Sequence, residues 1–308
     1  MLGFLVRRVV LMFVALFIIA TATWFLMQFL PGSPFNDAKL SDEARAQLEA
    51  KYGLDDPLLV QYGRYMANLA QGDLGNSFYF SNQPVLGIIL ERLPVSAFLG
   101  IQAVILGSVV GIALGMVAAM RHNTFWDSTT VAISVLGISV PSFVLGPLLQ
   151  YWVGVKLGWL PIAFFESWRY SILPTLALAA FVVATVARFI RSEMLEVFGQ
   201  DYVTLAKAKG LSQFAVVLRH VLRNAAIPLI TVLAPLAIFL ITGTIVVERI
   251  FEVPGIGEMF IRSIVVTDYS MIMGTTLFFA VAFVLAILVQ DILYAIVDPR
   301  IRVSGESR

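Results

Sequence analysis

The sequence contains no cysteine, and only 13% of its 308 residues are charged. The absence of cysteine excludes disulfides, thiolate metal sites and cysteine nucleophiles. Soluble domains carry about 25% charged residues, so a chain that is 59% apolar could not present a water-soluble surface. Its formal charge of +1 provides no overall field that would attract nucleic acid or an acidic substrate. The composition predicts a protein whose solvent is lipid.

Catalytic and nucleotide-binding groups are also scarce. The two histidines, His122 and His220, form no HExxH pair, and His220 lies beside Arg219 and Arg223 as a loop histidine in a basic surface. The sequence has no Gly-Lys dipeptide, which the GxxxxGK[ST] phosphate-binding loop requires. We therefore expect no enzyme activity, metal site or cofactor on this chain. Any ATP must be bound by another subunit.

Long apolar runs without charge dominate the rest of the sequence. In lipid every backbone N–H and C=O group must be paired within its own segment, so each run is expected to be a helix. The first run has 22 residues, longer than the core of a signal peptide, and is interpreted as an uncleaved span. Pro141, Pro147 and Pro235 predict kinks or broken turns. The predicted fold is an all-α polytopic membrane protein with six spans, at Val9–Leu30, Val95–Met120, Val131–Val155, Ser171–Ala187, Ile227–Val247 and Met271–Val289.

The short loops carry a charge bias that predicts orientation. With the N-terminus in the cytoplasm, the inside segments hold twelve of the 21 Lys and Arg residues, and these segments are 1–8, 121–130, 188–226 and 290–308. Cytoplasmic loops of membrane proteins are enriched in basic residues. Both termini are therefore expected in the cytoplasm.

The six predicted spans contain no ionisable side chain. Ion-driven carriers usually keep acids, histidines or lysines near the middle of the membrane, and an intramembrane enzyme needs a nucleophile, paired acids or metal ligands. Glu248 and Asp291 lie near predicted span ends and are interpreted as interfacial charges satisfied by water or a neighbouring chain. A stand-alone channel or secondary carrier remains a rival hypothesis.

The second span carries a GxxxGxxxG pattern at Gly107, Gly111 and Gly115. Glycines at this spacing share one helical face and let a second backbone approach closely. We expect a helix-packing contact there, in preference to a substrate groove.

The chain divides into three parts by hydropathy. These are a cytoplasmic N-terminus with the first span (1–30), an extracytoplasmic helical segment (31–94), and a permease-like core of helices 2–6 with a cytoplasmic loop at 188–226 (95–308). In the second part, Ser41 and Gly53 bound a predicted helix at Asp42–Tyr52, and Pro57 opens another. The second helix has an apolar face that either packs against the spans or meets a partner, made of Leu58, Leu59, Tyr62, Tyr65, Met66 and Leu69.

The loop 188–226 is too polar to cross a membrane. Its first half is predicted to be a helix that ends at Gly210, where glycine permits a positive φ and a sharp turn. A second helix restarts with Ser212 as a possible N-cap. Its predicted apolar face is Phe214, Val217, Leu218, Val221 and Leu222, with Arg219 and Arg223 opposite. Such an elbow either docks a soluble partner or lies on the membrane surface.

The loop resembles the cytoplasmic EAA loop of binding-protein-dependent ABC importer permeases. That family's pattern is EAAxxxG, and Thr204, Leu205 and Ala206 occupy its first three places before Gly210, so two of the three depart. The departures resemble the peptide, nickel and glutathione branch, which commonly has a Tyr before a TA-basic-AKG run. By this resemblance the ATPase-coupling residues are Asp201, Tyr202, Thr204, Ala206, Lys207, Ala208, Lys209, Gly210, Arg219, Arg223 and Pro228.

Further motifs extend the resemblance over nearly the whole chain. They are PGSPF (31–35), KYGLDDPL (51–58), GISVPSF (137–143), VVERIFEVPGIGEMF (246–260) and DILYAIVDPRI (291–301). Together they resemble the first permease subunit of an oligopeptide or dipeptide importer with a type I ABC importer permease fold. Nickel chelates or glutathione are the alternative cargo.

The resemblance also implies partners and a location. The partners are a second homologous permease, two cytoplasmic ATPases that bind ATP and Mg, and an extracytoplasmic peptide-binding protein, all at the cell membrane of a bacterium or archaeon. No residue is assigned to substrate. Polar side chains in the predicted spans more readily form hydrogen bonds between helices, and these are Ser139, Ser142, Gln150, Thr231 and Thr242.

Overall fold

The computed structural model describes residues 2–29, 43, 47, 53, 55–242 and 244–297. These residues are helical apart from turns and one isolated bridge between Asn76 and Pro84, which confirms the all-α fold class. The PGSPF motif, nearly all of the predicted helix Asp42–Tyr52 and the end of the DILYAIVDPRI motif lie outside the described residues.

Five helical segments of the described chain are long and apolar enough to cross a membrane. They are Val6–Gln28 in α1 (Leu2–Gln28), α4 (Val85–Met120), Trp168–Phe198 containing α7 (Ile172–Phe198), Leu229–Ile250 containing α11 (Leu229–Ile241) and α12 (Ile245–Ile250), and Tyr269–Leu293 in α14 (Tyr269–Val297). A sixth span exists if one bent helix pair is counted. The six apolar segments predicted from the sequence correspond to these elements.

The third predicted span is a broken one. The helix α5 (Phe125–Ser139) ends just before Val140. The helix α6 (Ser142–Leu149) and the π-helix η1 (Gln150–Lys156) follow at a bend of 99°. The residue before a proline is restricted to extended backbone, and Val140 accordingly has φ −85° and ψ 112°. The break predicted at Pro141 is therefore confirmed. Helices α6 and α11 continue through Pro147 and Pro235.

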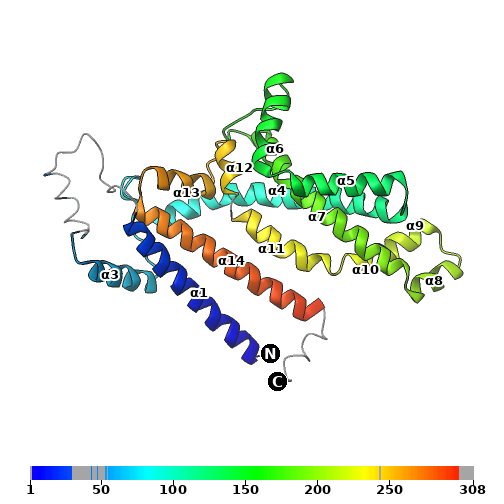
Figure 1. The fold of residues 1–308 in the computed structure, drawn as a ribbon, viewed down its shortest axis with the longest axis horizontal. Helices are drawn as coiled ribbons and strands as arrows, with labels where there is room; N and C mark the ends of the chain where they lie inside the picture. The colour runs from blue at the N-terminus through cyan, green and yellow to red at the C-terminus, as the bar shows by residue number, and fades with distance from the viewer. Residues whose placement is uncertain are drawn as a thin grey trace. The chain divides into compact units, whose positions relative to one another are not determined.

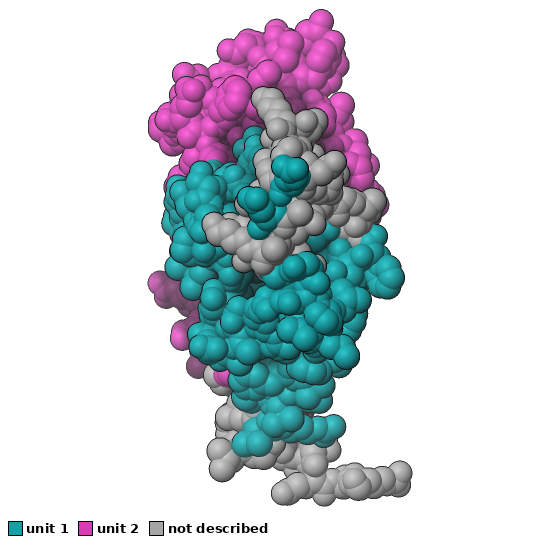
Figure 2. Space-filling model, turned by 90° about the vertical axis from the view of Figure 1, so that its left-hand side faces the viewer, with its two compact units in different colours: residues 1–94, 255–284 teal, residues 95–254, 285–308 magenta. Residues whose placement is uncertain are grey.

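Contacts divide the chain into two compact units (Figure 2), residues 1–94 with 255–284 and residues 95–254 with 285–308. The division into 1–30, 31–94 and 95–308 made from the sequence stays a prediction.

The first unit contains α1, α3 (Leu58–Ala70), the start of α4, α13 (Ile256–Val265) and the start of α14. Its apolar core includes Val85, Ile89, Ile256, Met259 and Met271. These side chains come from the starts of α4 and α14 and from α13. The core therefore joins three elements that are far apart in the sequence.

The helix α3 packs on α1 through one side only. The Tyr62 hydroxyl lies 2.8 Å from Thr21 Oγ1, and the Tyr62 ring meets the Trp24 ring at 5.3 Å between centroids. Burial, with a smaller effect of Tyr62, raises the pKa of Tyr65 to about 12. In the apolar face predicted for α3, Leu58 and Leu59 are 53% and 77% exposed, whereas Tyr62 packs on α1.

The second unit is organised around α7 (Figure 1). This helix has twelve buried residues and contacts α5, α6, α10, α11 and α12. Short elements at the C-terminal end of α7 form the loop that the sequence singled out: α8 (Asp201–Ala208), α9 (Gln213–Val216), the π-helix η3 (Val217–Leu222) and α10 (Arg223–Ala225).

Candidate functional site

The loop after α7 is an elbow of short helices. The backbone leaves α7 at Gly199, begins α8 at Asp201 and turns at Gly210, which has φ +80°. A side chain at Gly210 would meet no atom within 4 Å, so the turn needs glycine for its backbone conformation and not for space. Ser212 then caps α9 by accepting a hydrogen bond from the Ala215 N–H at 3.3 Å. The turn and the N-cap predicted from the sequence are confirmed.

The elbow differs from the prediction in its first half. The sequence predicted one helix from Arg188 to Gly210, but α7 ends at Phe198 and α8 is a separate helix. Gly199 is the C-cap of α7. The extended backbone of Gln200 then changes the direction of the chain before α8 begins. Lys207 Nζ lies 5.8 Å above the centre of the Phe198 ring, a cation–π contact that joins α8 to the end of α7.

The elbow has one buried and one exposed face. Val203, Ala206, Val217 and Val221 are buried and belong to the apolar cluster that contains Met194 of α7. Of the apolar face predicted for the second helix, Val217 and Val221 are buried, whereas Phe214 and Leu218 are 63% and 39% exposed. The elbow is therefore fixed to α7 by one face.

The predicted coupling residues lie mainly on the exposed face. Ala206 is buried, and Pro228 is partly buried at the start of α11. The remaining ones are exposed, namely Asp201, Tyr202, Thr204, Lys207, Ala208, Lys209, Gly210, Arg219 and Arg223. Exposed apolar side chains adjoin them on the elbow, at Leu205 (55%) and Phe214 (63%). The elbow thus presents basic and apolar groups together.

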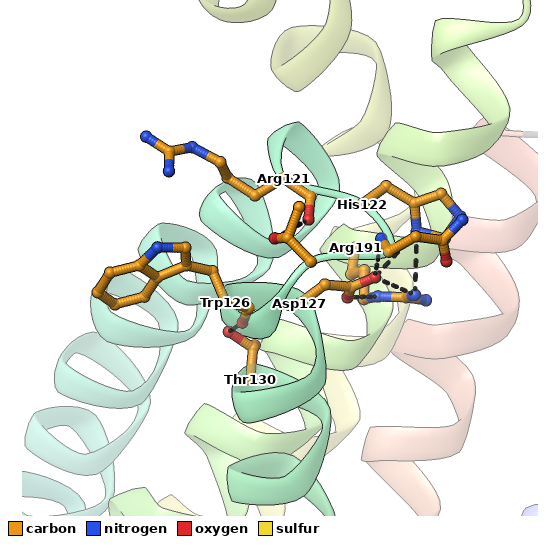
Figure 3. A network of polar contacts seen from close by, with 8 residues as sticks. Arg121, His122, Trp126, Asp127, Thr130 and Arg191 are labelled. Carbon is orange, nitrogen blue, oxygen red and sulfur yellow. Dashed lines mark hydrogen bonds and ion pairs between the residues drawn. The ribbon is translucent and has the colours of Figure 1, made fainter.

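A polar cluster connects the turn before α5 to α7 (Figure 3). Arg191 donates from Nε to Asp127 Oδ1 at 2.5 Å and from Nη2 to Asp127 Oδ2 at 2.9 Å, and His122 Nδ1 lies 2.9 Å from the same Oδ2. Asp127 also accepts from the Asn123 N–H at 2.9 Å. Its carboxylate is 5% exposed, so the turn and α7 are held by a buried, two-pronged ion pair.

Sequence reasoning missed this cluster. In the sequence, Arg191 is one of several basic residues in the segment 188–226, and His122 lies in the separate segment 121–130. The available signal was Asp127, an acid in the first turn of an apolar helix. Nothing in the spacing shows that its partner is 64 residues away.

Glu248 was predicted to be an interfacial charge in contact with water or a neighbouring chain, and the structure places it elsewhere. Its side chain is fully buried, and its Oε1 accepts from the Thr244 N–H at 3.2 Å. The carboxylate thus bonds to a free N–H at the start of α12, which offsets part of its burial cost.

The glycine pattern of α4 lies against α7. A Cβ at Gly107 would be 2.4 Å from Val182 Cβ, one at Gly111 2.7 Å from Val186 Cβ, and one at Gly115 2.6 Å from the Ala187 carbonyl oxygen. Real Cβ atoms do not approach so closely, so these positions admit only glycine without a shift of α4 or α7.

Three of the polar residues in the predicted spans form hydrogen bonds to backbone carbonyl oxygens. Gln150 Nε2 donates to the carbonyl oxygens of Ile162 and Ile250 at 2.7 and 3.0 Å. Thr231 and Thr242 donate to carbonyl oxygens within three or four residues. Within the described ranges, no group of three His, Cys, Asp or Glu residues could hold a metal ion.

The apolar helices define a multi-pass α-helical membrane protein. Residues 111–303 match the family model described as binding-protein-dependent transport system inner membrane component, and residues 1–100 match the N-terminal membrane component model of such systems. The chain belongs to this family, whose members are permease domains of ABC importers.

Curated relatives are similar over nearly the full length. The chain is 46% identical to the dipeptide transport system permease protein of Lactococcus lactis subsp. cremoris, over 98% of this chain and 100% of the relative. It is 41% identical to the Bacillus subtilis dipeptide transport system permease protein, over 97% of each chain. It is 40% identical to the oligopeptide transport system permease protein of Haemophilus influenzae, over 98% of this chain and 100% of the relative.

Proposed function

We propose that this chain is a permease subunit of an ATP-driven peptide importer and forms half of its translocation pathway. The cargo assignment is supported by the names of the relatives, which are dipeptide and oligopeptide transport permeases. Nickel chelates or glutathione are the alternative cargo of the same class, supported by the resemblance of the loop to that branch.

One observation carries the mechanistic part of the proposal. The elbow at 201–226 has a buried face that shares the core of α7 and an exposed face with basic and apolar side chains. Exposed apolar groups on a polar loop favour a protein contact over a purely solvated one. A partner that moves the exposed face would therefore displace α7 as well, because packed cores transmit movement. We propose that the partner is a cytoplasmic ATPase.

The remaining components follow from this role. The partners are a second homologous permease, two cytoplasmic ATPases that hold ATP and Mg, and an extracytoplasmic peptide-binding protein. This chain supplies no nucleotide site, cofactor or catalytic residue of its own. Both termini lie in the cytoplasm, and the membrane is the plasma or inner membrane of a bacterium or archaeon.

The mechanism is alternating access. The loaded binding protein docks outside, and closure of the ATPases on ATP draws the coupling elbows together. The two permeases then open outward to receive the peptide. Hydrolysis of ATP returns them to the inward-facing state.

The elbow can be tested with two glycines at its turns. Gly210→Val places a β-branched residue at φ +80°, which costs about 1–2 kcal/mol locally and re-aims the elbow. Gly199→Ala is the matched control, because Gly199 has φ −79°, which alanine adopts freely. In the reconstituted importer we expect Gly210→Val to abolish most peptide-stimulated ATP hydrolysis and uptake, and Gly199→Ala to retain them. Full transport by an assembled Gly210→Val complex would contradict the coupling role.

A further inference from the structure

A cavity of about 230 Å³ lies between α5 and α7 in the second unit. It is lined from α5 by Thr130, Val131, Ser134 and Val135, and from α7 by Ala187, Arg188 and Arg191. Gly137 and Ala184 hold the two helices in tight contact nearby, since a Cβ at Gly137 would lie 2.8 Å from Ala184 Cβ. The cavity begins about one helical turn away from that contact. It lies on the side of the contact that faces the loop at 121–124.

The cavity carries an excess of positive charge. The charge of Arg191 is balanced by its two hydrogen bonds to Asp127. Arg188 has no ion-pair or hydrogen-bond partner in the part of the chain that the structure describes. No acidic side chain lines the cavity within that part. Arg188 is an exposed side chain, and it adds a cation without an ion-pair partner in the described chain to the lining of the cavity.

The α5 wall supplies hydroxyl groups at the same place. Thr130 and Ser134 are 4% and 3% exposed. The Thr130 hydroxyl donates to the Trp126 carbonyl oxygen at 3.0 Å, whereas the Ser134 hydroxyl has no partner among the described residues. A nearly buried hydroxyl without a partner costs free energy unless a ligand or water occupies the adjacent space. A cation and an available hydroxyl group together favour an oxyanion.

The residues around the mouth of the cavity are typical of a membrane interface. Val131 and Val135 at its rim are 41% and 51% exposed, on a helix apolar enough to lie in lipid. Phe125 and Trp126, at the start of α5, are 77% and 53% exposed, and exposed aromatic residues mark the membrane interface. At a rise of about 1.5 Å per residue, Thr130 lies about 8 Å below Phe125 along the helix. Figure 3 shows Trp126 pointing away from the Asp127–Arg191 pair.

We propose that this cavity binds the phosphate group of an anionic phospholipid. The phosphate pairs with Arg188 and accepts a hydrogen bond from Ser134, and an acyl chain runs along Val131 and Val135. A phospholipid fits better than a soluble anion because the rim is apolar and open to lipid. The inner leaflet is the source if the proposed orientation of the chain holds.

The test uses the purified, complete importer and native mass spectrometry of bound lipid. Phosphatidylglycerol is titrated against the wild-type complex and against complexes carrying Arg188→Gln, Ser134→Leu or Arg121→Gln. Arg121 is an exposed arginine at the same end of α5 that does not line the cavity, so it is the matched control. Phosphatidylcholine, inorganic phosphate, and peptides with a free or an amidated C-terminus are separate competitors.

We expect one phosphatidylglycerol site per chain that phosphatidylcholine and inorganic phosphate do not displace. Arg188→Gln should weaken its affinity about five-fold, since a basic residue near the membrane surface contributes about that factor. Ser134→Leu should lower its occupancy by filling the cavity while the charge is kept, and Arg121→Gln should leave it unchanged.

Three results would overturn the proposal. Equal losses in Arg121→Gln and Arg188→Gln would show a diffuse surface charge effect, and displacement by inorganic phosphate would show a free-anion site. Displacement by peptides only when their carboxylate is free would make the cavity part of the substrate path. Peptide uptake by the same complexes, assayed in phosphatidylcholine vesicles, tests the proposed function separately.

Discussion

Asp127 is a buried acid that joins the turn before α5 to α7. It accepts hydrogen bonds from Arg191, His122 and the Asn123 N–H, so one buried carboxylate orders a turn and fixes it to α7. Breaking a buried ion pair from one side leaves an uncompensated charge. Exposed ion pairs contribute little, because water competes for both partners.

Asp127→Ala is expected to destabilise the protein by about 2 to 3 kcal/mol. The value lies below the ~3 to 5 kcal/mol of a fully buried pair, because the Arg191 side chain is 24% exposed. Thermal unfolding of the purified subunit in detergent measures the change. Asp56→Ala is the control, because its pair with Arg64 is 36% and 50% exposed and should contribute at most about 1 kcal/mol. Equal effects of the two substitutions would contradict this account.

Sequence reasoning could predict some residue conformations and not others. Gly210 and Ser212 were predictable because their roles depend on neighbouring backbone. The burial of Glu248 was not, since a hydropathy window registers its charge but not the helices that pack around it. The contact of Asp127 with Arg191 likewise depends on how α5 docks on α7.

At the scale of elements, small residues on the neighbouring helices allow those helices to pack closely against α7. Gly107 and Gly111 of α4 and Gly137 of α5 all lie against it at distances that exclude a side chain. The α4 pattern was visible as GxxxGxxxG, whereas Gly137 has no such repeat in the sequence. The bend between α5 and α6 was predictable at Pro141, but its angle of 99° depends on tertiary packing.

Substitutions at two glycines of α4 distinguish the effect of helix packing on stability from the effect of helix propensity. A Cβ at Gly111 would lie 2.7 Å from Val186 Cβ and 2.9 Å from the Val183 carbonyl oxygen, whereas one at Gly87 would meet nothing within 4 Å. Gly111→Ala should destabilise the subunit by about 1 to 3 kcal/mol through overpacking. Gly87→Ala should be neutral or stabilising by up to about 1 kcal/mol, because alanine favours helix. Thermal unfolding of both variants decides this, and a stabilised Gly111→Ala would refute the close packing of α4 on α7.

At the scale of the whole molecule, composition alone predicts the class of protein. Long charge-free runs require helices in lipid, and the described residues contain five helices long and apolar enough to cross a membrane, or six if the bent pair is one span. Composition does not predict the cargo, because no ionisable side chain or binding motif identifies a substrate. The cargo proposal therefore depends on the relatives.

The proposed orientation can be measured with single cysteines, since these 308 residues contain none. Ser81→Cys and Ser212→Cys place exposed thiols in the segment between α3 and α4 and in the elbow. An impermeant thiol reagent applied to intact cells should label position 81 and should reach position 212 only after lysis. The reverse pattern would invert the topology and place the elbow outside the cell.

The central claim is that this chain moves peptides only when ATPases act on it. The measurement is uptake of a labelled peptide into liposomes that contain this chain alone, or this chain with the second permease, the two ATPases and the binding protein. We expect accumulation by the complete complex with ATP and none by the chain alone, even under a proton or sodium gradient. Gradient-driven accumulation by the isolated chain would contradict the account and establish a secondary carrier. ATP-dependent uptake of nickel chelates or glutathione, without peptide uptake, would contradict the cargo assignment while leaving the importer class in place.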